Sequence, residues 1–244
     1  MTKRRVALVV PFVSLMCILT AAACASRSAM VSSAPGQVIT RAEQSDGWRM
    51  LFDGATTKGW RGFRTDTVPA GWKADSGVLW KEARTRDIVS VDQFGDFELS
   101  LEWKIASRGN AGLFYRGTEE YSRIYWSAPE YQLLDDSLAS DNKIEDHRAG
   151  SAYGLYAPPR GVVKPANEWN VTRVLAKGAH VEHWLNGRKV VEYEIGSSDW
   201  EAKVKASKFN AWPNYGRAKK GHIAIQGDHN GRLELRNIRI RELK

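Results

Sequence analysis

Apolar and polar residues alternate along much of the chain, and the alternation is most regular between residues 96 and 105. There, every odd-numbered position from Phe97 to Ile105 is apolar, and every even-numbered position from Glu98 to Lys104 is polar. Successive side chains of a β-strand point to opposite faces, so this period predicts a strand with one face in a core. Further strands are expected over residues 87–91, 169–176, 180–185, 188–194, 222–226 and 232–242.

Turn signals separate these strands. Asn186-Gly187 predicts a tight hairpin, because both central positions of such a turn favour positive φ. Ser198-Asp199-Trp200-Glu201 has the pattern of a capping box and predicts one short helix that runs to about Lys208. Many short strands with one helix indicate an all-β fold, either a β-sandwich or a jelly roll.

A polar face is expected on two extended segments within residues 110–136. Strand alternation gives Arg116 and Phe114 one face of the first segment, and gives Glu130 and Gln132 one face of the second. A face that carries Arg, Glu and Gln cannot be a dry core face unless its polar groups are paired. We therefore expect a wet sheet face that binds a polar ligand.

The N-terminus has the pattern of an export signal. Lys3-Arg4-Arg5 precedes an apolar run at 6–20 and then Ala21-Ala22-Ala23-Cys24. The run is shorter than the ~20 residues that span a bilayer, which favours a cleaved signal peptide. Residues 1–23 resemble a lipoprotein signal peptide, and Cys24 would carry lipid; ordinary signal peptidase cleavage nearby is the alternative. The protein would be exported as a bacterial periplasmic or outer membrane lipoprotein that touches the membrane through its lipid anchor only.

Residues 24–45 lack apolar periodicity and are expected to form a flexible tether before one domain at 46–244. Loss of Lys3, Arg4 and Arg5 lowers the formal net charge from +8 to +5. This dispersed charge argues against nucleic acid as a partner. With Cys17 removed and Cys24 lipidated, the domain would have no disulfide and would depend on its core.

Short motifs follow one another in a characteristic order. They are Leu51-Phe52-Asp53-Gly54, Gly109-Asn110-Ala111-Gly112-Leu113-Phe114 with Arg116, Glu130-Tyr131-Gln132-Leu133-Leu134-Asp135, Tyr153-Gly154-Leu155-Tyr156, Glu168-Trp169-Asn170, Leu185-Asn186-Gly187 and Gly221-His222-Ile223-Ala224-Ile225-Gln226. Over residues 47–243 the chain resembles the 3-keto-disaccharide hydrolase domain family.

The resemblance implies a concanavalin-like jelly roll of two antiparallel sheets. It also implies a carbohydrate substrate, a disaccharide or glucoside already oxidised at C3. One departure is visible: many relatives have Gln-Asp-His-Gly after the late strand, whereas this chain has Gln226-Gly227-Asp228-His229-Asn230-Gly231. The register of Asp228 and His229 against the family pattern is therefore open.

The local spacing of carboxylates does not supply an ordinary retaining glycosidase site, which needs two carboxyls ~5 to 5.5 Å apart. Glu130 has Gln132 as its neighbour on the same face, and Asp135 would lie ~16 Å along a regular strand. A ketone at C3 changes the requirement, because it acidifies the proton at C2. Removal of that proton, elimination at C1 and addition of water would cleave the bond, with one base, one acid and donors for the enolate.

Three residues are the candidate catalytic groups. Glu130 is the expected base, with ligation of a sugar hydroxyl or metal as the alternative. Arg116 would hold the ketone or enolate oxygen, or else form a structural ion pair with Glu130. His147 would act as acid or metal ligand, or else be an exposed loop histidine. The other functions considered are a non-catalytic carbohydrate-binding module on the same fold and a surface interaction protein with a degenerate site.

The expected substrate-binding residues are polar or aromatic: Asn110, Gln132, Asp135, Trp126, Tyr153, Trp212, Gln226 and His229. Asp135 has local capping of a turn as its alternative role. Trp126 and Trp212 would stack on a sugar ring or pack in the protein. No required cofactor can be read from the sequence. The histidines lack zinc spacing, while a divalent cation with oxygen ligands, such as calcium, remains open.

Overall fold

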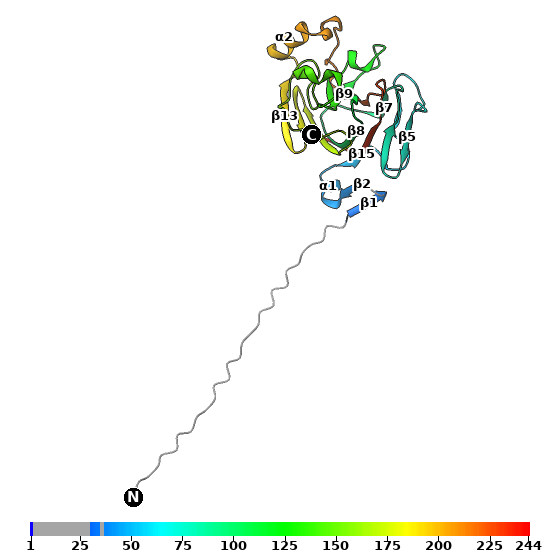
Figure 1. Ribbon diagram of the computed structural model, residues 1–244, viewed down its shortest axis with the longest axis vertical. Helices are drawn as coiled ribbons and strands as arrows, with labels where there is room; N and C mark the ends of the chain where they lie inside the picture. The colour runs from blue at the N-terminus through cyan, green and yellow to red at the C-terminus, as the bar shows by residue number, and fades with distance from the viewer. Residues whose placement is uncertain (2–29, 35–36) are drawn as a thin grey trace.

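The computed structural model describes Met1 and residues 30–34 and 37–244, which form two stacked antiparallel sheets and a short N-terminal hairpin (Figure 1). The larger sheet has the order β13 (Arg188–Glu194), β12 (His180–Leu185), β11 (Asn170–Lys177), β8 (Phe97–Ile105), β15 (Leu233–Glu242), β6 (Val78–Lys81) and β5 (Trp72–Asp75), with β3 (Arg49–Met50) also paired to β15. The smaller sheet has the order β10 (Glu130–Leu134), β9 (Asn110–Gly117), β14 (Gly221–Ile225), β7 (Ile88–Phe94) and β4 (Trp60–Gly62). The prediction of an all-β sandwich is confirmed.

The hydrophobic core lies between the two sheets. Phe97, Leu99, Leu101 and Trp103 of β8 are fully buried, as their alternation predicts. The inner face of the smaller sheet supplies Leu113, Tyr115, Tyr131, Leu133, Ile223 and Ile225 to the same core. Each large apolar side chain buried in this way stabilises the fold by about 1.5 to 3 kcal/mol.

Paired charges cover the outer face of the larger sheet. Glu98 of β8 accepts from Arg173 of β11 at 2.6 Å and from Arg241 of β15 at 2.8 Å. Next along β8, Glu102 accepts from Arg236 at 2.8 Å and from Asn237 at 2.6 Å. Cross-strand pairs of opposite charge stabilise a sheet, so these polar residues are satisfied within the protein.

Ordered structure begins earlier than the expected domain start at residue 46. The strands β1 (Met30–Ala34) and β2 (Gln37–Thr40) pair with each other, and α1 (Arg41–Ser45) follows. Thr40 and Glu43 form a capping box at the start of α1, and Glu43 accepts from Arg239 of β15 at 2.6 Å. The expectation of a flexible tether is therefore wrong for residues 37–45, which the cap and this ion pair hold against the larger sheet.

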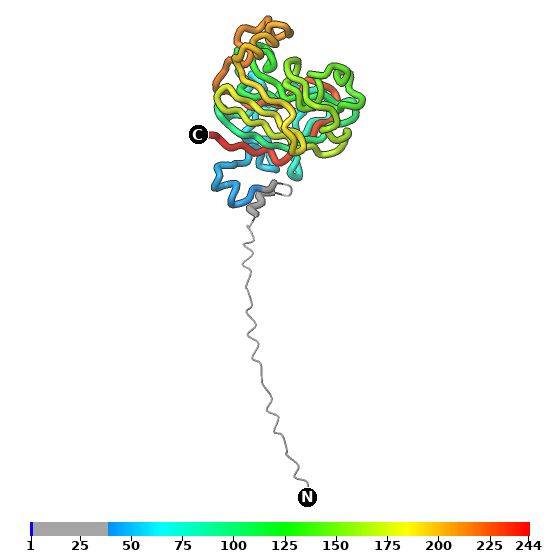
Figure 2. Tube along the Cα trace, turned by 90° about the vertical axis from the view of Figure 1, so that its left-hand side faces the viewer, coloured from blue at the N-terminus to red at the C-terminus, as the bar shows by residue number. Residues whose placement is uncertain are grey.

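The predicted late helix is α2 (Ser198–Ala206), but its N-cap is Ser197, whose hydroxyl accepts from the backbone N–H of Trp200. The expected capping box that starts at Ser198 is therefore wrong: the cap lies one residue earlier, and the N3 residue is then Trp200, which has no carboxylate to complete a box. Figure 2 shows the end of β15 beside the N-terminal segment.

Within the described residues, none of the helices combines the length and apolar character needed to cross a bilayer. The predicted signal peptide and Cys24 lie outside the described residues, apart from Met1.

One polar network lies inside the sandwich. The hydroxyl of Tyr115 is 2.8 Å from His183 Nε2 and makes a short hydrogen bond with the hydroxyl of Tyr193. His183 Nδ1 is 3.1 Å from the carbonyl oxygen of Gly150. Burial lowers the pKa of His183 to about 4, so its ring is neutral at pH 7. Every polar group of this network has a partner.

Candidate active site

The register of β9 and β10 places three polar side chains on the outer face of the smaller sheet. Gln132 lies opposite Gly112, and Leu134 lies opposite Asn110. Because same-face positions are two residues apart, Glu130, Gln132 and Asn110 share this face. Gln132 donates to the side-chain oxygen of Asn110 at 3.4 Å. The predicted polar face therefore exists, and its opposite side holds Tyr131 and Leu133 in the core.

A pocket of about 220 Å³ opens over this face. It is lined by Asn110, Tyr125, Glu130, Gln132, Asp141, Tyr153, Lys208, Gln226, Asp228 and His229. Three elements surround its floor: the η1 helix (Ile124–Trp126), the loop with η2 (Ser140–Lys143) and η3 (Glu145–His147), and η4 (Lys208–Ala211). The rest of the outer face carries a small apolar cluster that includes Phe114 and Ile124. The polar half of the face is thus the part left open to a ligand.

Gly112 makes room for the Glu130 side chain. A Cβ atom at position 112 would lie 2.2 Å from Glu130 Oε1 and 2.9 Å from the Phe114 ring. Any larger residue at this position would displace the carboxyl group. The glycine of the sequence motif therefore sets the position of the acid on the neighbouring strand.

Glu130 is buried, and its pKa is raised to about 8. Burial is the largest cause; Lys208 lowers the pKa, and the nearby carboxylates Asp87, Asp228 and Asp141 raise it. A carboxyl group that titrates near neutral pH can both accept and release a proton under physiological conditions. Strongly shifted groups inside a cleft are candidates for catalysis.

Asp87 is a second buried acid beside the pocket. Burial raises its pKa to about 6, against a hydrogen bond from the backbone N–H of Gly227, which lowers it. The nitrogen of that N–H lies 2.7 Å from Asp87 Oδ1.

The loop that bears Asp228 and His229 is also held by Lys81, whose ammonium donates to the carbonyl oxygens of His229 at 2.8 Å and Gly231 at 3.0 Å.

Several polar atoms of the pocket have no partner. Gln132 Oε1, Gln226 Oε1 and Asp228 Oδ1 are buried without a hydrogen bond from any described residue. Most buried polar atoms in proteins are paired, because each unpaired one costs about 1 to 3 kcal/mol. These atoms are therefore placed to receive hydrogen bonds from a hydroxyl-rich ligand.

His147 lies behind the pocket wall. Its ring stacks on Tyr153, with centroids 4.1 Å apart, and its Nδ1 is 3.9 Å from Asp141 Oδ2. Tyr153 donates to the same carboxylate oxygen at 3.3 Å. Burial lowers the pKa of His147, which favours the neutral ring. The histidine is thus next to two pocket residues but does not line the pocket itself.

The expectation that Arg116 shares a face with Glu130 is wrong. Arg116 has φ of 53°, a left-handed conformation that interrupts strand alternation. Its guanidinium donates to the carbonyl oxygens of Gly95 and Gly178, both at 2.8 Å, and to Asp96 Oδ1 at 3.1 Å. It neither pairs with Glu130 nor lines the Glu130 pocket, and its donors are engaged elsewhere.

Three expected substrate-binding residues are also outside the pocket. Asp135 accepts from the backbone N–H of Ser137 at 3.0 Å, which is local capping, and from the backbone N–H of the distant Arg108 at 2.8 Å. Trp126 and Trp212 stack on each other, with centroids 4.0 Å apart and planes 13° apart. Their rings join η1 to the segment after η4. By contrast, Asn110, Gln132, Tyr153, Gln226 and His229 line the pocket as expected.

Sequence reasoning did not select Tyr125, Asp141, Lys208 and Asp228, which line the pocket, or Asp87 beside it. Two of them had a sequence signal: Asp228 precedes His229 after a predicted strand, and Tyr125 lies in a loop whose aromatic rings could stack on a sugar. Lys208 follows a helix and Asp87 begins a strand, and neither position is unusual. Their role arises from contacts between distant segments.

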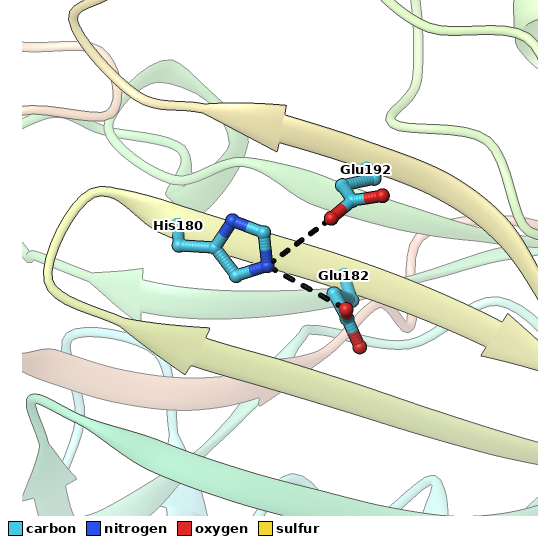
Figure 3. Close-up of side chains that lie close together, drawn as sticks. All are labelled: His180, Glu182 and Glu192. Atoms are coloured by element: carbon cyan, nitrogen blue, oxygen red, sulfur yellow. Dashed lines mark ion pairs between the residues drawn. The ribbon is translucent and has the colours of Figure 1, made fainter.

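Two places offer donor atoms for a cation. The pocket has carboxylates of Glu130, Asp141 and Asp228, the oxygen ligands that calcium prefers, but the Lys208 ammonium already supplies a positive charge there. The second place is the β12–β13 hairpin, where His180, Glu182 and Glu192 form the one group among the described residues whose possible ligand atoms all lie within 4.8 Å (Figure 3).

The hairpin group is already neutralised. Lys189 Nζ lies 3.1 Å from Glu182 and 2.6 Å from Glu192. His180 Nδ1 is 2.6 Å from Glu194, and this hydrogen bond raises the pKa of the imidazole. Because His180 and Lys189 both lie within ion-pair distance of the same two carboxylates, the arrangement has the chemistry of an ion-pair network.

Known proteins match this chain over the range that holds the pocket. A family model described as a 3-keto-alpha-glucoside-1,2-lyase-like domain matches residues 47–241, a range that includes every pocket-lining residue. A Bacteroides thetaiotaomicron protein named 3-keto-disaccharide hydrolase is 32% identical over 231 residues, which cover 82% of this chain and 79% of that protein.

Solved structures agree with these matches. A Parabacteroides distasonis protein, provisionally assigned as a glycosyl hydrolase, has a TM-score of 0.80 and 34% identity, with 85% of this chain and 99% of that chain covered. A second such protein of this organism has a TM-score of 0.63 and 27% identity, with 80% and 99% covered. A Bacillus subtilis protein with a galectin-like fold has a TM-score of 0.50 at 13% identity, with 85% and 93% covered, and supports the sandwich fold alone.

Proposed function

Because the chain belongs to the family of 3-keto-alpha-glucoside-1,2-lyase-like domains, we propose that it cleaves the glycosidic bond of disaccharides or glucosides already oxidised at C3. The observation that carries this proposal is the buried Glu130 carboxyl with its pKa near 8, inside a pocket with unpartnered amide oxygens. The name of the Bacteroides relative supports the substrate class. The alternative is a non-catalytic sugar-binding module, which would not need a buried carboxyl group with a raised pKa.

The first step is removal of the proton at C2. The C3 ketone acidifies this proton, the ionised carboxylate of Glu130 takes it, and the electrons of the C–H bond form an enolate on the C3 oxygen. The ammonium of Lys208, on the same pocket wall, is placed to stabilise the negative charge. The raised pKa of Glu130 makes its ionised form a stronger base than an ordinary carboxylate.

The second step breaks the bond between C1 and the leaving oxygen. The enolate electrons form a C1=C2 double bond as the ketone returns, and the leaving oxygen takes a proton. Asp87 is our candidate donor, because its raised pKa keeps a protonated fraction near neutral pH. Water then adds its hydroxyl to C1 while the ionised Asp87 takes the remaining proton of the water, and Glu130, after its proton has exchanged with solvent, protonates C2. Release before the addition of water would make the enzyme a lyase.

The test uses a matched pair of disaccharides, one oxidised at C3 and one not. We expect the purified protein to release a keto-sugar from the oxidised compound only, and we expect Glu130→Gln to remove this activity while the fold persists. Glu192→Gln, on the distant hairpin, is the matched control. Reaction in deuterated water should place deuterium at C2. Binding of both sugars without turnover would support the module, and absence of deuterium, with exchange during work-up excluded, would contradict elimination.

Export, cleavage before Cys24 and lipidation of this cysteine remain part of the proposal. The sequence pattern at residues 1–24 supports them. The substrate would then meet the enzyme in the periplasm or at the outer membrane. Labelling with a radioactive fatty acid, compared between the natural chain and Cys24→Ser, tests the anchor.

A further inference from the structure

A second and larger pocket adjoins the Glu130 pocket. It has a volume of about 790 Å³ and is lined by Phe63, Arg64, Arg84, Thr85, Arg86, Asp87, Ser122, Arg123 and Asp228. Asp228 belongs to the walls of both pockets. A ligand held in the smaller pocket can therefore extend past Asp228 into the larger one, which we call the arginine groove.

The guanidinium groups of the arginine groove come from three separate loops. Arg64 follows β4, Arg84 and Arg86 lie between β6 and β7, and Arg123 precedes η1. Backbone contacts fix these loops: the N–H of Arg64 donates to Glu119 at 2.6 Å, and the N–H of Thr85 donates to the carbonyl oxygen of Gly227 at 2.9 Å. The groove is thus built by loops that are held in place.

These arginines differ from most arginines of the protein. In the described part of the chain, twelve arginines have a carboxylate within 4.0 Å: Arg49, Arg61, Arg116, Arg123, Arg148, Arg160, Arg173, Arg217, Arg232, Arg236, Arg239 and Arg241. Arg64, Arg84 and Arg86 have no such partner among the described residues, and all three line this groove. Arg41, Arg108 and Arg188 also lack a carboxylate partner among the described residues, but they do not line the groove, which thus holds three of the six unpaired guanidinium groups.

The charges of the groove do not cancel. Asp228 lies 3.7 Å from Arg123 and offsets that one cation. Asp87 is the other acid in the wall, and its Oδ1 already accepts from the Gly227 N–H. The guanidinium groups of Arg84 and Arg86 remain without a counter-ion or a hydrogen-bond acceptor among the described residues. A planar guanidinium binds a carboxylate, phosphate or sulfate through two parallel hydrogen bonds.

We propose that the arginine groove is the leaving-group subsite and that it selects 3-keto-glycosides whose leaving group carries a carboxylate, phosphate or sulfate. This assignment rests on the proposed function, because it identifies the Glu130 pocket as the place of the 3-keto-glucosyl ring. Asp87, the candidate proton donor to the leaving oxygen, lies in the groove wall. The larger volume of the groove suits a leaving group of at least the size of the sugar ring.

The test compares 3-keto-glucosides that differ only in the charge of the leaving group. The neutral member carries a 4-carbamoylphenyl group, and the anionic members carry a carboxylate, phosphate ester or sulfate ester at the same position. We expect kcat/KM to be about tenfold to a hundredfold higher for at least one anionic member. The three anionic arms distinguish which group the arginines prefer. Equal kcat/KM for all four would overturn the proposal.

The decisive variant is Arg84→Gln combined with Arg86→Gln, since both side chains are exposed and neither forms an ion pair with another described residue. We expect it to lose the preference for the anionic substrate and to keep turnover of the neutral one. Arg188→Gln, an exposed arginine without an ion partner on β13, is the matched control and should change neither. An equal loss for charged and neutral substrates would contradict a charge-selective subsite.

A binding measurement separates this proposal from the proposed function. If no 3-keto-glucoside is turned over, the proposed function fails, but the groove can still be tested with phenyl phosphate, phenyl sulfate and benzoate by titration calorimetry. Binding of at least one of these anions that is lost in the Arg84→Gln, Arg86→Gln variant would support an anion site. Absence of binding by all three would overturn it.

Discussion

The strands β9 and β10 bury polar side chains on both of their faces. The polar groups on the inner face have hydrogen-bond partners, whereas some of those on the outer face do not. On the inner face, Tyr115 shares hydrogen bonds with His183 and Tyr193, and Tyr131 donates to the carbonyl oxygen of Trp184 at 3.2 Å. On the outer face, Gln132 Oε1 is buried without a partner, and Glu130 titrates near pH 8.

The presence or absence of hydrogen-bond partners distinguishes polar groups that stabilise the fold from polar groups that are available to a ligand. A satisfied buried network stabilises a fold, whereas unpaired buried groups and a buried acid reduce stability. The unpaired buried groups and the buried acid lie on the outer face, beside the open pocket. The inner face of these two strands has neither. Burial of polar residues alone would not have distinguished the two; the presence or absence of partners does.

Replacement of the acid should have the largest effect. Glu130→Gln is expected to lower kcat/KM by about a hundredfold to ten-thousandfold, the range for loss of a general base. The free energy of unfolding should stay equal or rise at pH 8, because the variant has no carboxyl to ionise in a buried place. Steady-state kinetics and urea unfolding measure both. A large loss of stability would show that the outer face is structural after all.

Adjacent positions on opposite faces sharpen the comparison. Gly112→Ala should lower kcat/KM by about a hundredfold, because the new Cβ displaces the Glu130 carboxyl and small misplacements of catalytic groups are costly. Ala111→Gly, on the inner face, should instead lower stability by about 1 kcal/mol and leave activity near that of the unaltered chain. The reverse pattern would contradict the assignment of the two faces.

The pH dependence should expose the state of the outer-face acid. With Glu130 ionised as the base and Asp87 protonated as the acid, kcat/KM should rise with pH to about 6, stay level, and fall above about 8, because these two pKa values bound the range in which that pair of states is most populated. A continued rise of kcat/KM through pH 8 would exclude Asp87 as the proton donor. The pKa of Glu130 is raised above the ordinary value of 4.5, so its ionisation disfavours the folded state. Stability should therefore fall as pH rises from 4.5 to about 8, and Glu130→Gln should remove this part of the decline.

The smallest effect on activity is expected from the inner face. Tyr193→Phe removes one hydroxyl from the inner network but leaves Tyr115 paired with His183. Stability should fall by about 1 kcal/mol, with kcat/KM changed less than about twofold because the site is not contacted. Thermal unfolding and kinetics on the same preparation provide the check. A hundredfold loss of activity would mean that the two faces are coupled.

Local patterns predicted the strands and the outer-face pair Glu130 and Gln132, because alternation depends only on neighbouring residues. The same rule failed at Arg116, where a positive φ breaks the alternation and no residue type signals it. It could not find Lys208 or Asp87, because their place beside Glu130 depends on how strands and loops distant in the sequence pack together. Trp126 and Trp212 appeared suited to a sugar ring, but each ring is the other's partner.

The ion pair between Glu43 and Arg239 holds α1 against the outside of the larger sheet, where Ser100 and Glu102 line the same shallow recess. The Glu130 pocket opens on the outside of the other sheet. The described chain therefore enters the domain on the side opposite the reactive opening, so a lipid anchor at Cys24, as proposed, would leave the Glu130 pocket on the unanchored side.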